Sequence, residues 1–421
     1  MNTTTRQTLA VAAMLALLAG CGSAVTAETC DPGTSRDCAC PGGGTGTQLC
    51  AADGSEWGAC DCGGTDADAD DTLSDTPEPD ADSSLPETTG PDADADDVPD
   101  VPDVSPTPTN VVDLLLVIDN SPSMDGPQSV LMDAMPGFLA ALAEQAAAAG
   151  LDLDLNVGVV SSDMGTYGYA LMTCPNPNGG DDGCLQHEPR ATGGCEPVYP
   201  TFLHRLDSES GGPTTSELAA AVACIGTLGT DGCGIEQPLR SLTRALTTQT
   251  AVGECNAGFL RTDSTVAVLV LSDENDCSVR PDRASLFDTS LSELGHIGVR
   301  CFLNQDYLVR VDEIVDALQG LETAGHGLFL KALVGVPPGV ATCNGFGDSL
   351  DDCLDEPAMT ETVDAVEETR LLTVCESPTA RAVPGRRFVE LAQGFGRRAH
   401  VSSICAADYT PALAAWAGTL F

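Results

Sequence analysis

The chain has 421 residues, of which 63 are acidic and 18 are Lys or Arg, giving a formal net charge of −45. This charge argues against nucleic acid and anionic lipid surfaces as partners, because both present phosphate groups. The 19 cysteines indicate an oxidising compartment in which disulfide bonds persist.

Residues 1–21 are predicted to be a targeting segment rather than part of the folded protein. A positive charge precedes an apolar run from Leu9 to Leu18, which is too short to span a bilayer. The run ends at Leu18-Ala19-Gly20-Cys21, which resembles the lipobox of bacterial lipoproteins. The resemblance implies cleavage before Cys21 and attachment of lipid to its side chain. An ordinary signal peptide with an incidental cysteine is the alternative.

The residue after the lipobox bears on localisation. Gly22, and not Asp, follows Cys21, so nothing favours retention in the inner membrane. We therefore expect an outer membrane lipoprotein of the cell envelope, at the cell surface or on the periplasmic face, held to the membrane by its N-terminal lipid.

Two further segments precede the main domain. Residues 29–62 carry six cysteines and few large apolar side chains, so we expect a small disulfide-bonded Cys-rich module. Zinc binding is the alternative, but the pairs at Cys38 and Cys60 lack the two-residue gap of a zinc knuckle. Residues 63–109 are rich in Asp and Pro, and this low hydrophobicity with high like charge predicts a disordered linker that acts as a stalk.

Residues 110–421 are long enough for one large domain, and their apolar patterns alternate between strand and helix. Strands are expected over 111–118, 153–160, 265–271, 328–334 and 399–404, with a short edge strand at 169–173. Helices are expected over 128–149 (kinked or restarted at Pro136), 216–225, 235–247, 308–321, 387–393 and 410–418. This alternation predicts a doubly wound α/β fold with a mainly parallel sheet.

Two stretches depart from the alternation, namely 164–215 and 337–380. Each holds three cysteines among Gly-, Pro- or acid-rich sequence, so we expect disulfide-tied loop insertions. Loops of this length within a compact domain usually carry function, although they can also simply cap the sheet.

Polar side chains follow the first expected strand in the sequence Asp119-Asn120-Ser121-Pro122-Ser123. The alternate spacing of Asp119, Ser121 and Ser123 turns a carboxylate and two hydroxyls the same way, at the carboxyl end of a strand, where α/β sheets bind ligands. These oxygen donors suit a small hard cation. The alternative is that the two serines only cap the following helix.

The strand and this motif together resemble the opening of a von Willebrand factor A (VWA) domain, a Rossmann-like fold whose metal-ion-dependent adhesion site (MIDAS) begins with the same residues. The resemblance implies that a Thr on a second loop and an Asp after the central strand complete the site. Thr230 is the best match for the Thr, with Thr227 as the alternative, and Asp273 matches the Asp. The chain departs from the family at Ser272-Asp273-Glu274-Asn275, where Thr-Asp-Gly is more usual, so this loop is more acidic.

The resemblance implies a surface-anchored lipoprotein that binds a partner protein through a divalent cation. Mg²⁺ or Mn²⁺ would be held by Asp119, Ser121, Ser123, Thr230 and Asp273, and a Glu or Asp carboxylate of the partner would complete its coordination. Two alternatives remain. The protein is a structural envelope lipoprotein without metal-dependent binding, or it is a metal-dependent hydrolase with Glu274 or Asp276 as its base.

The sequence motifs do not favour catalysis. The five histidines form no H-E-x-x-H or His-x-His arrangement, and the chain has neither a G-x-S-x-G elbow nor a phosphate-binding G-x-x-x-x-G-K loop. We therefore expect a binding protein and not an enzyme.

Overall fold

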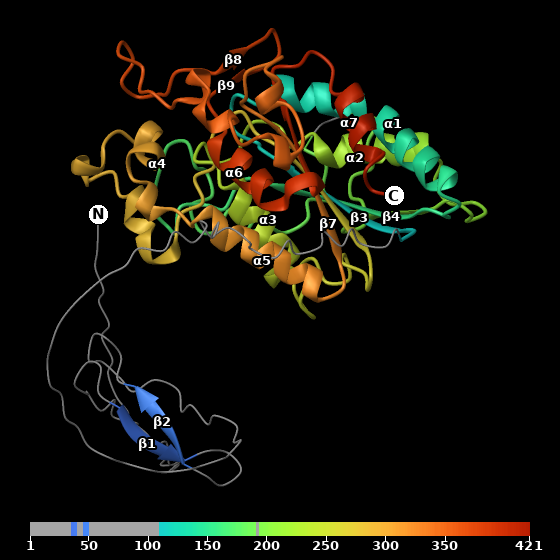
Figure 1. Cartoon of the computed structure of the whole chain (residues 1–421), viewed down its shortest axis with the longest axis horizontal. Helices are drawn as coiled ribbons and strands as arrows, with labels where there is room; N and C mark the ends of the chain where they lie inside the picture. Colours follow the sequence, from blue (N-terminus) through green and yellow to red (C-terminus); the bar gives the residue numbers. More distant parts are fainter. Residues whose placement is uncertain (1–34, 40–44, 50–108, 191–192) are drawn as a thin grey trace, which may run out of the picture. The chain divides into compact units, whose positions relative to one another are not determined.

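A computed structural model of the protein describes residues 35–39, 45–49, 109–190 and 193–421 (Figure 1). The chain divides into two units, Met1–Pro99 and Asp100–Phe421. In the first unit, strands β1 (Ser35–Ala39) and β2 (Thr45–Leu49) pair antiparallel. The predicted targeting segment lies outside the described residues, as do nearly all of the predicted linker and most of the predicted Cys-rich module.

The second unit is built on a six-stranded sheet with the order β10-β7-β6-β3-β4-β5. Neighbouring strands are parallel except for β5, which pairs antiparallel with β4 at one edge. The strands are β3 (Val111–Ile118), β4 (Asp154–Ser161), β5 (Leu203–Leu206), β6 (Thr265–Leu271), β7 (Gly327–Val334) and β10 (Ala399–Ser403). The predicted α/β class with a mainly parallel sheet is therefore confirmed.

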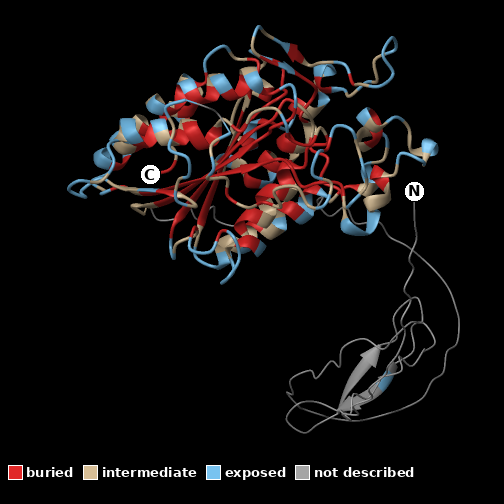
Figure 2. Cartoon of the chain, turned by 180° about the vertical axis from the view of Figure 1, so that it is seen from behind, coloured by how far each residue is buried: buried red, intermediate tan, exposed pale blue. Residues whose placement is uncertain are grey.

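Helices cover both faces of this sheet, because the central strands are apolar on both sides. Leu114 and Leu116 of β3 belong to one buried cluster, while Leu115 and Val117 belong to another. The first face carries α1 (Asp125–Ala148), α2 (Thr215–Gly226) and α7 (Thr410–Ala417), and the second carries α3 (Pro238–Leu246), α5 (Val311–Thr323) and α6 (Arg386–Phe395). Figure 2 shows the buried residues concentrated in the sheet and on the inner sides of the helices.

Helix α1 remains a single helix through Pro136, where the sequence predicted a kink or a fresh start. A proline inside a helix lacks the N–H for one hydrogen bond. Buried side chains on either side of it, Met135 and Phe138, anchor the helix to the sheet. The ring of Phe138 also stacks on Trp416 of α7, with 5.4 Å between ring centroids. Packing on both sides of Pro136 outweighs the missing hydrogen bond.

The first predicted insertion, 164–215, differs from the expectation in one respect. The expected edge strand at 169–173 is wrong, since this segment contributes only an isolated bridge between Leu171 and Cys174. The antiparallel edge strand is instead β5, later in the same insertion. Its short, weakly apolar sequence, Leu203-His204-Arg205-Leu206, gives little signal because only one of its residues is buried.

All twelve cysteines after residue 170 form disulfide bonds, as the even count predicted. The pairs are Cys174–Cys233, Cys184–Cys255, Cys195–Cys224, Cys277–Cys301, Cys343–Cys353 and Cys375–Cys405. Most of these bonds join an insertion to the α/β body. The insertions are therefore fixed against the body by covalent bonds.

Short elements complete the second unit. They are helix α4 (Arg300–Leu303), the paired strands β8 (Cys375–Glu376) and β9 (Arg381–Ala382), and 3-10 helices at Thr248–Thr250, Pro281–Phe287, Ser292–Leu294, Ile297–Val299, Gln305–Tyr307, Ala341–Cys343, Gly347–Ser349, Cys353–Asp355, Pro357–Met359 and Gly396–Arg398. Among the described residues, no helix has the length and apolar character needed to cross a membrane.

Candidate functional site

The carboxyl ends of β3 and β6 bring the two predicted aspartates to the same edge of the sheet. These strands are parallel neighbours in which Ile118 lies opposite Leu271, so Asp119 and Ser272 follow at the same level. The backbone N–H of Asp119 donates to the carbonyl of Leu271 over 2.9 Å. Because both strands are central in the sheet, their pairing fixes where Asp119 and Asp273 lie at its carboxyl edge.

Asp119 is fully buried and is held by three hydrogen bonds. Its Oδ1 accepts from the backbone N–H of Ser121 at 2.8 Å and from the hydroxyl of Ser162 at 3.2 Å, and its Oδ2 accepts from the hydroxyl of Ser272 at 2.8 Å. Burial raises the pKa of the Asp119 carboxyl, and these hydrogen bonds oppose the rise. The loops that follow β3, β4 and β6 thus together fix the orientation of the Asp119 carboxylate.

The two serines of the motif connect Asp119 to Asp273. The hydroxyls of Ser121 and Ser123 lie 3.2 Å apart, and Ser123 donates to Oδ1 of Asp273 at 3.1 Å. Helix α1 begins after Met124, and no side chain caps its first turn. The alternative that these serines cap the helix is therefore wrong.

Asp273 is buried, and the residue directly after β9 holds its backbone in place, because the N–H of Val383 donates to the Asp273 carbonyl at 3.0 Å. Burial, followed by the negative charges of Asp119 and Glu274, raises the pKa of Asp273 to about 8, and the hydrogen bond from Ser123 opposes this rise. Burial, followed by the charge of Asp119, raises the pKa of Glu274 to about 7. These shifts show that the carboxyl groups lie close enough to repel one another.

The structure places Thr230 on the loop between α2 and α3, partly exposed. Within the described residues, its side chain makes no hydrogen bond. The loop itself is tied to the motif, because Gln128 donates both to the carbonyl of Gly229 at 2.9 Å and to that of Asp119 at 2.8 Å. The alternative, Thr227, uses its hydroxyl to bond Ala223 at the end of α2, 2.8 Å away.

A fourth carboxylate, Glu236, joins this group and was not singled out from the sequence. Its side chain is 7% exposed, and its pKa is raised well above the ordinary value by burial and then by the charges of Asp119, Glu274 and Asp273. The backbone fixes its position, since its carbonyl accepts from the N–H of Cys277 at 2.8 Å. The only sequence signal is an acidic residue between Ile235 and the start of α3.

Ser162 and Ser272 were also missed as partners of Asp119. Each directly follows a buried strand, in the same way as Asp119 follows β3. Hydroxyl groups after parallel strands meet at one sheet edge, which is the signal that could have found them.

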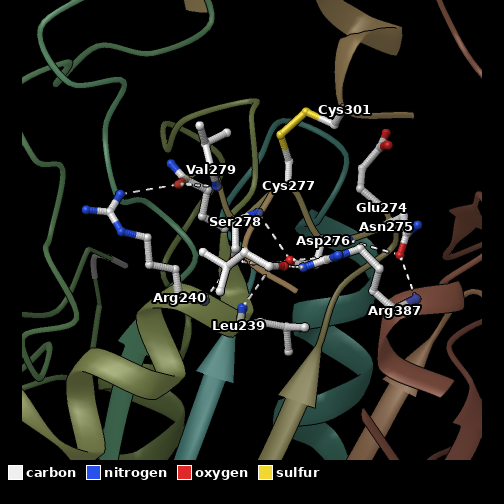
Figure 3. A network of polar contacts seen from close by, with 12 residues as sticks. Leu239, Arg240, Glu274, Asn275, Asp276, Cys277, Ser278, Val279, Cys301 and Arg387 are labelled. Atoms are coloured by element: carbon white, nitrogen blue, oxygen red, sulfur yellow. Dashed lines mark hydrogen bonds and ion pairs between the residues drawn. A yellow bond between two sulfur atoms is a disulfide. The ribbon is translucent and has the colours of Figure 1, made fainter. Parts of the chain in front are cut away.

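Asp276, one of the two candidate catalytic bases, has a structural role (Figure 3). Its Oδ1 accepts from the N–H of Leu239 at the start of α3, at 3.0 Å, and from the hydroxyl of Ser278 at 2.7 Å. Its Oδ2 pairs with Nε of Arg387 at 3.0 Å. The Asp276 carboxylate therefore caps α3 and ties it to Arg387 of α6.

Glu274, the other candidate base, has different surroundings. Its side chain extends away from the strand ends in Figure 3. Within the described residues, its carboxylate makes neither a hydrogen bond nor an ion pair. Within the same described residues, Asp119, Glu236 and Asp273 likewise form no ion pair.

The oxygen donors at this edge can be tested against the predicted metal. Asp119 and Asp273 supply carboxylates, and Ser121 and Ser123 supply neutral hydroxyls, all of which are hard ligands of the kind that Mg²⁺ and Mn²⁺ prefer. Across the described residues, no three His, Cys, Asp or Glu side chains are arranged to hold a metal together. A cation here would thus depend on the serine hydroxyls and on water.

Comparison with known protein families and with curated proteins finds no match to this chain.

Proposed function

We propose that residues 110–421 form a VWA-type domain that binds a partner protein through a divalent cation. Asp119, Ser121, Ser123 and Asp273 would hold Mg²⁺ or Mn²⁺, with Thr230 as the fifth predicted ligand. The observation that carries the proposal is the 3.1 Å hydrogen bond between Ser123 and Asp273, which joins the two halves of the motif across 150 residues of sequence.

The charge balance of the site supports the same proposal. Two buried carboxyl groups, those of Asp119 and Asp273, lie near one another, and within the described residues neither is paired with a basic side chain. Buried carboxylates in proteins are normally paired or bound to metal. A divalent cation would supply the positive charge that these groups lack.

The chemistry of the ligands favours binding over reaction. Serine hydroxyls bring no negative charge, so a cation held partly by them stays electron-poor and attracts a further carboxylate. Ser123 is exposed, and so the site is open to a Glu or Asp side chain of a partner protein on that side. Binding of the partner protein would therefore require the divalent cation.

The N-terminal part of the chain would place this domain in the cell envelope. We propose that lipid on Cys21 anchors the protein to the outer membrane and that residues 63–109 act as an extended acidic stalk. The net charge of −45 is unsuited to nucleic acid, in keeping with a protein partner.

Thermal unfolding tests the proposal with a matched pair of aspartates. Asp119→Ala removes a buried predicted ligand, whereas Asp125→Ala removes an exposed aspartate at the first position of α1. A ligand that binds only the folded state stabilises it by about 2.7 kcal/mol at about 100 times its Kd. We expect Mg²⁺ to raise the Tm of the wild type and of Asp125→Ala, and to leave that of Asp119→Ala unchanged.

An equal rise in Tm with Mg²⁺ in all three proteins would mean that the cation binds at a site that does not include Asp119. A wild type whose Tm does not respond to Mg²⁺ or Mn²⁺ would favour the alternative of a structural envelope lipoprotein.

A further inference from the structure

A cavity of about 200 Å³ lies beside the carboxyl edge of the sheet. Glu236 and the segment from Glu274 to Cys277 form its floor, and residues of the 297–305 segment and of the second insertion form its other walls. A water molecule takes about 10–15 Å³ on the same scale, so the cavity has room for a ligand of several heavy atoms.

Two carboxylates face this cavity without a partner. Glu236 is 7% exposed and Glu274 is half-buried, and both line the cavity. Within the described residues, neither carboxylate accepts a hydrogen bond from another residue or pairs with a basic side chain. A buried carboxylate without a partner is costly, and so Glu236 in particular points to a ligand.

The other charged groups of the cavity are already engaged. Arg387 pairs with Asp276 at 3.0 Å, and Glu361 accepts from the side-chain amide of Asn275 at 3.0 Å. Arg370 pairs with Asp364 and Glu367, at 3.1 and 3.0 Å. The two arginines of the cavity are therefore neutralised, and within the described residues Glu236 and Glu274 are left without a counter-ion.

The remaining walls of the cavity are apolar, and the two segments that form them pack closely against each other. Val299 and Leu371 are buried in one small cluster, against which Phe302 packs. Gly298 lies so near the second insertion that a Cβ added to it would be 2.4 Å from the carbonyl oxygen of Thr369. The cavity thus combines an apolar wall with two carboxyl groups that have no basic partner among the described residues.

This combination suits an organic cation better than a second metal ion. Ca²⁺ takes six to eight oxygen ligands and Mg²⁺ takes an octahedral set, whereas the cavity offers two unengaged carboxylates and an apolar wall. An ammonium group on an alkyl chain matches both features, because its donors meet the carboxylates and its chain covers the apolar side chains.

We propose that this cavity binds a primary alkylammonium group, with Glu236 and Glu274 as its counter-ions. The group would belong either to a free amine or to a lysine side chain of a partner protein. The proposal stands on the cavity and its unpaired carboxylates, and it does not depend on the proposed cation site.

Calorimetric titration of the full chain, carried out with and without Mg²⁺, tests this proposal. The probes are n-pentylamine for a free amine, N-acetyl-lysine methylamide for a lysine side chain, and n-pentanol as the neutral analogue. We expect saturable binding of n-pentylamine and none of n-pentanol. Binding of the lysine derivative as well would identify a partner's lysine as a possible source, and binding of n-pentylamine alone would identify a free amine.

The variants are Glu236→Gln and Glu274→Gln, with Glu254→Gln as an exposed control. Loss of a charged hydrogen-bond partner corresponds to about tenfold weaker binding or more, so we expect this loss in the first two variants and wild-type affinity in the third. Asp119→Ala is expected to bind n-pentylamine as the wild type does, even if it no longer binds Mg²⁺.

Three results would overturn the proposal: equal binding of n-pentylamine and n-pentanol by the wild type, unchanged affinity in both glutamine variants, or displacement of n-pentylamine by Mg²⁺. The last would assign Glu236 and Glu274 to the metal site. The comparison of pentylamine with pentanol uses the wild type alone, so it stands even if a variant fails to fold.

Discussion

Two buried aspartates mark the ends of strand β3, Asp113 near its start and Asp119 directly after its last residue, and their surroundings differ. Asp113 pairs with Arg261, whose Nε lies 2.7 Å from its Oδ1, and it also accepts from the Arg261 backbone N–H at 2.8 Å. Within the described part of the chain, Asp119 accepts only from neutral N–H and O–H donors. The first arrangement is that of a structural ion pair, whereas the second leaves a carboxylate available to a cation from outside.

Lys331, the only lysine of the chain, is buried and has no acidic partner among the described residues. It lies on β7, and its Nζ contacts Nδ1 of His400 and donates to the hydroxyl of Ser402, both at 2.7 Å on β10. Burial lowers the pKa of Lys331 to about 7. Burial and the Lys331 charge lower the pKa of His400 to about 4. Both lowered pKa values therefore favour the neutral forms of Lys331 and His400.

The lowered pKa of Lys331 predicts a specific pH dependence of stability. Between about pH 7 and the unfolded value of 10.5, the unfolded chain holds a proton on Lys331 that the folded chain lacks, so stability rises with pH. Relative to Lys331→Met, the wild-type free energy of unfolding should increase by about 2 kcal/mol between about pH 7 and about pH 9. Urea unfolding at each pH measures this difference.

Removal of an exposed charge serves as the control for that experiment. Arg310→Met changes an exposed side chain, so its stability should follow the wild-type curve. Parallel curves for the wild type and Lys331→Met would mean that Lys331 keeps its ordinary pKa in the folded protein.

At the scale of elements, the insertions build the surroundings of the candidate site. The Cys174–Cys233 bond joins the first insertion to the loop that carries Thr230 and Glu236, and the N–H of Gly234 donates to the carbonyl of Thr173 at 2.7 Å. The Cys277–Cys301 bond fixes the loop after Asp273. The second insertion forms part of the wall of the adjoining cavity. Both insertions thus do more than cap the sheet.

Loop length predicts how much two of these disulfides contribute. Cys174–Cys233 closes a separation of 59 residues and Cys343–Cys353 one of 10, and all four cysteines are buried. In the chain-entropy description, the longer loop restricts the unfolded chain more, by about 1.5 kcal/mol for these lengths. Replacing both cysteines of the longer loop by serine should therefore lower the free energy of unfolding more than the same change in the shorter one.

Urea denaturation of the two double variants checks this order. An equal loss, or a larger loss for the Cys343–Cys353 pair, would mean that local packing and not loop closure determines the contribution of these bonds.

At the scale of the whole molecule, the sequence predicted the α/β body well. The strands β3, β6 and β7 are apolar on both faces, so their composition alone indicates buried parallel strands. Edge strand β5 could not be found in this way, because three of its four residues are not buried. The continuity of α1 was missed because packing against α7 decides it, and that contact is distant in the sequence.

Only part of the candidate site could be predicted from the sequence, again because some of its contacts join residues that are distant in the chain. Asp119, Ser121, Ser123 and Asp273 follow strands that the sequence reveals, and the fold brings them together. Glu236 lies on a loop whose position depends on the Cys174–Cys233 bond and on contacts with Ser162 and Cys277. No local pattern encodes such contacts.

Calorimetric titration of Mn²⁺ into the full chain tests the cation site most directly. The comparison is between the wild type, Asp273→Asn, which keeps the shape of a buried ligand, and Asp125→Asn, which changes an exposed aspartate. The account predicts one saturable site in the wild type and in Asp125→Asn, and its loss in Asp273→Asn. Absence of binding in the wild type, or unchanged binding in Asp273→Asn, would contradict it.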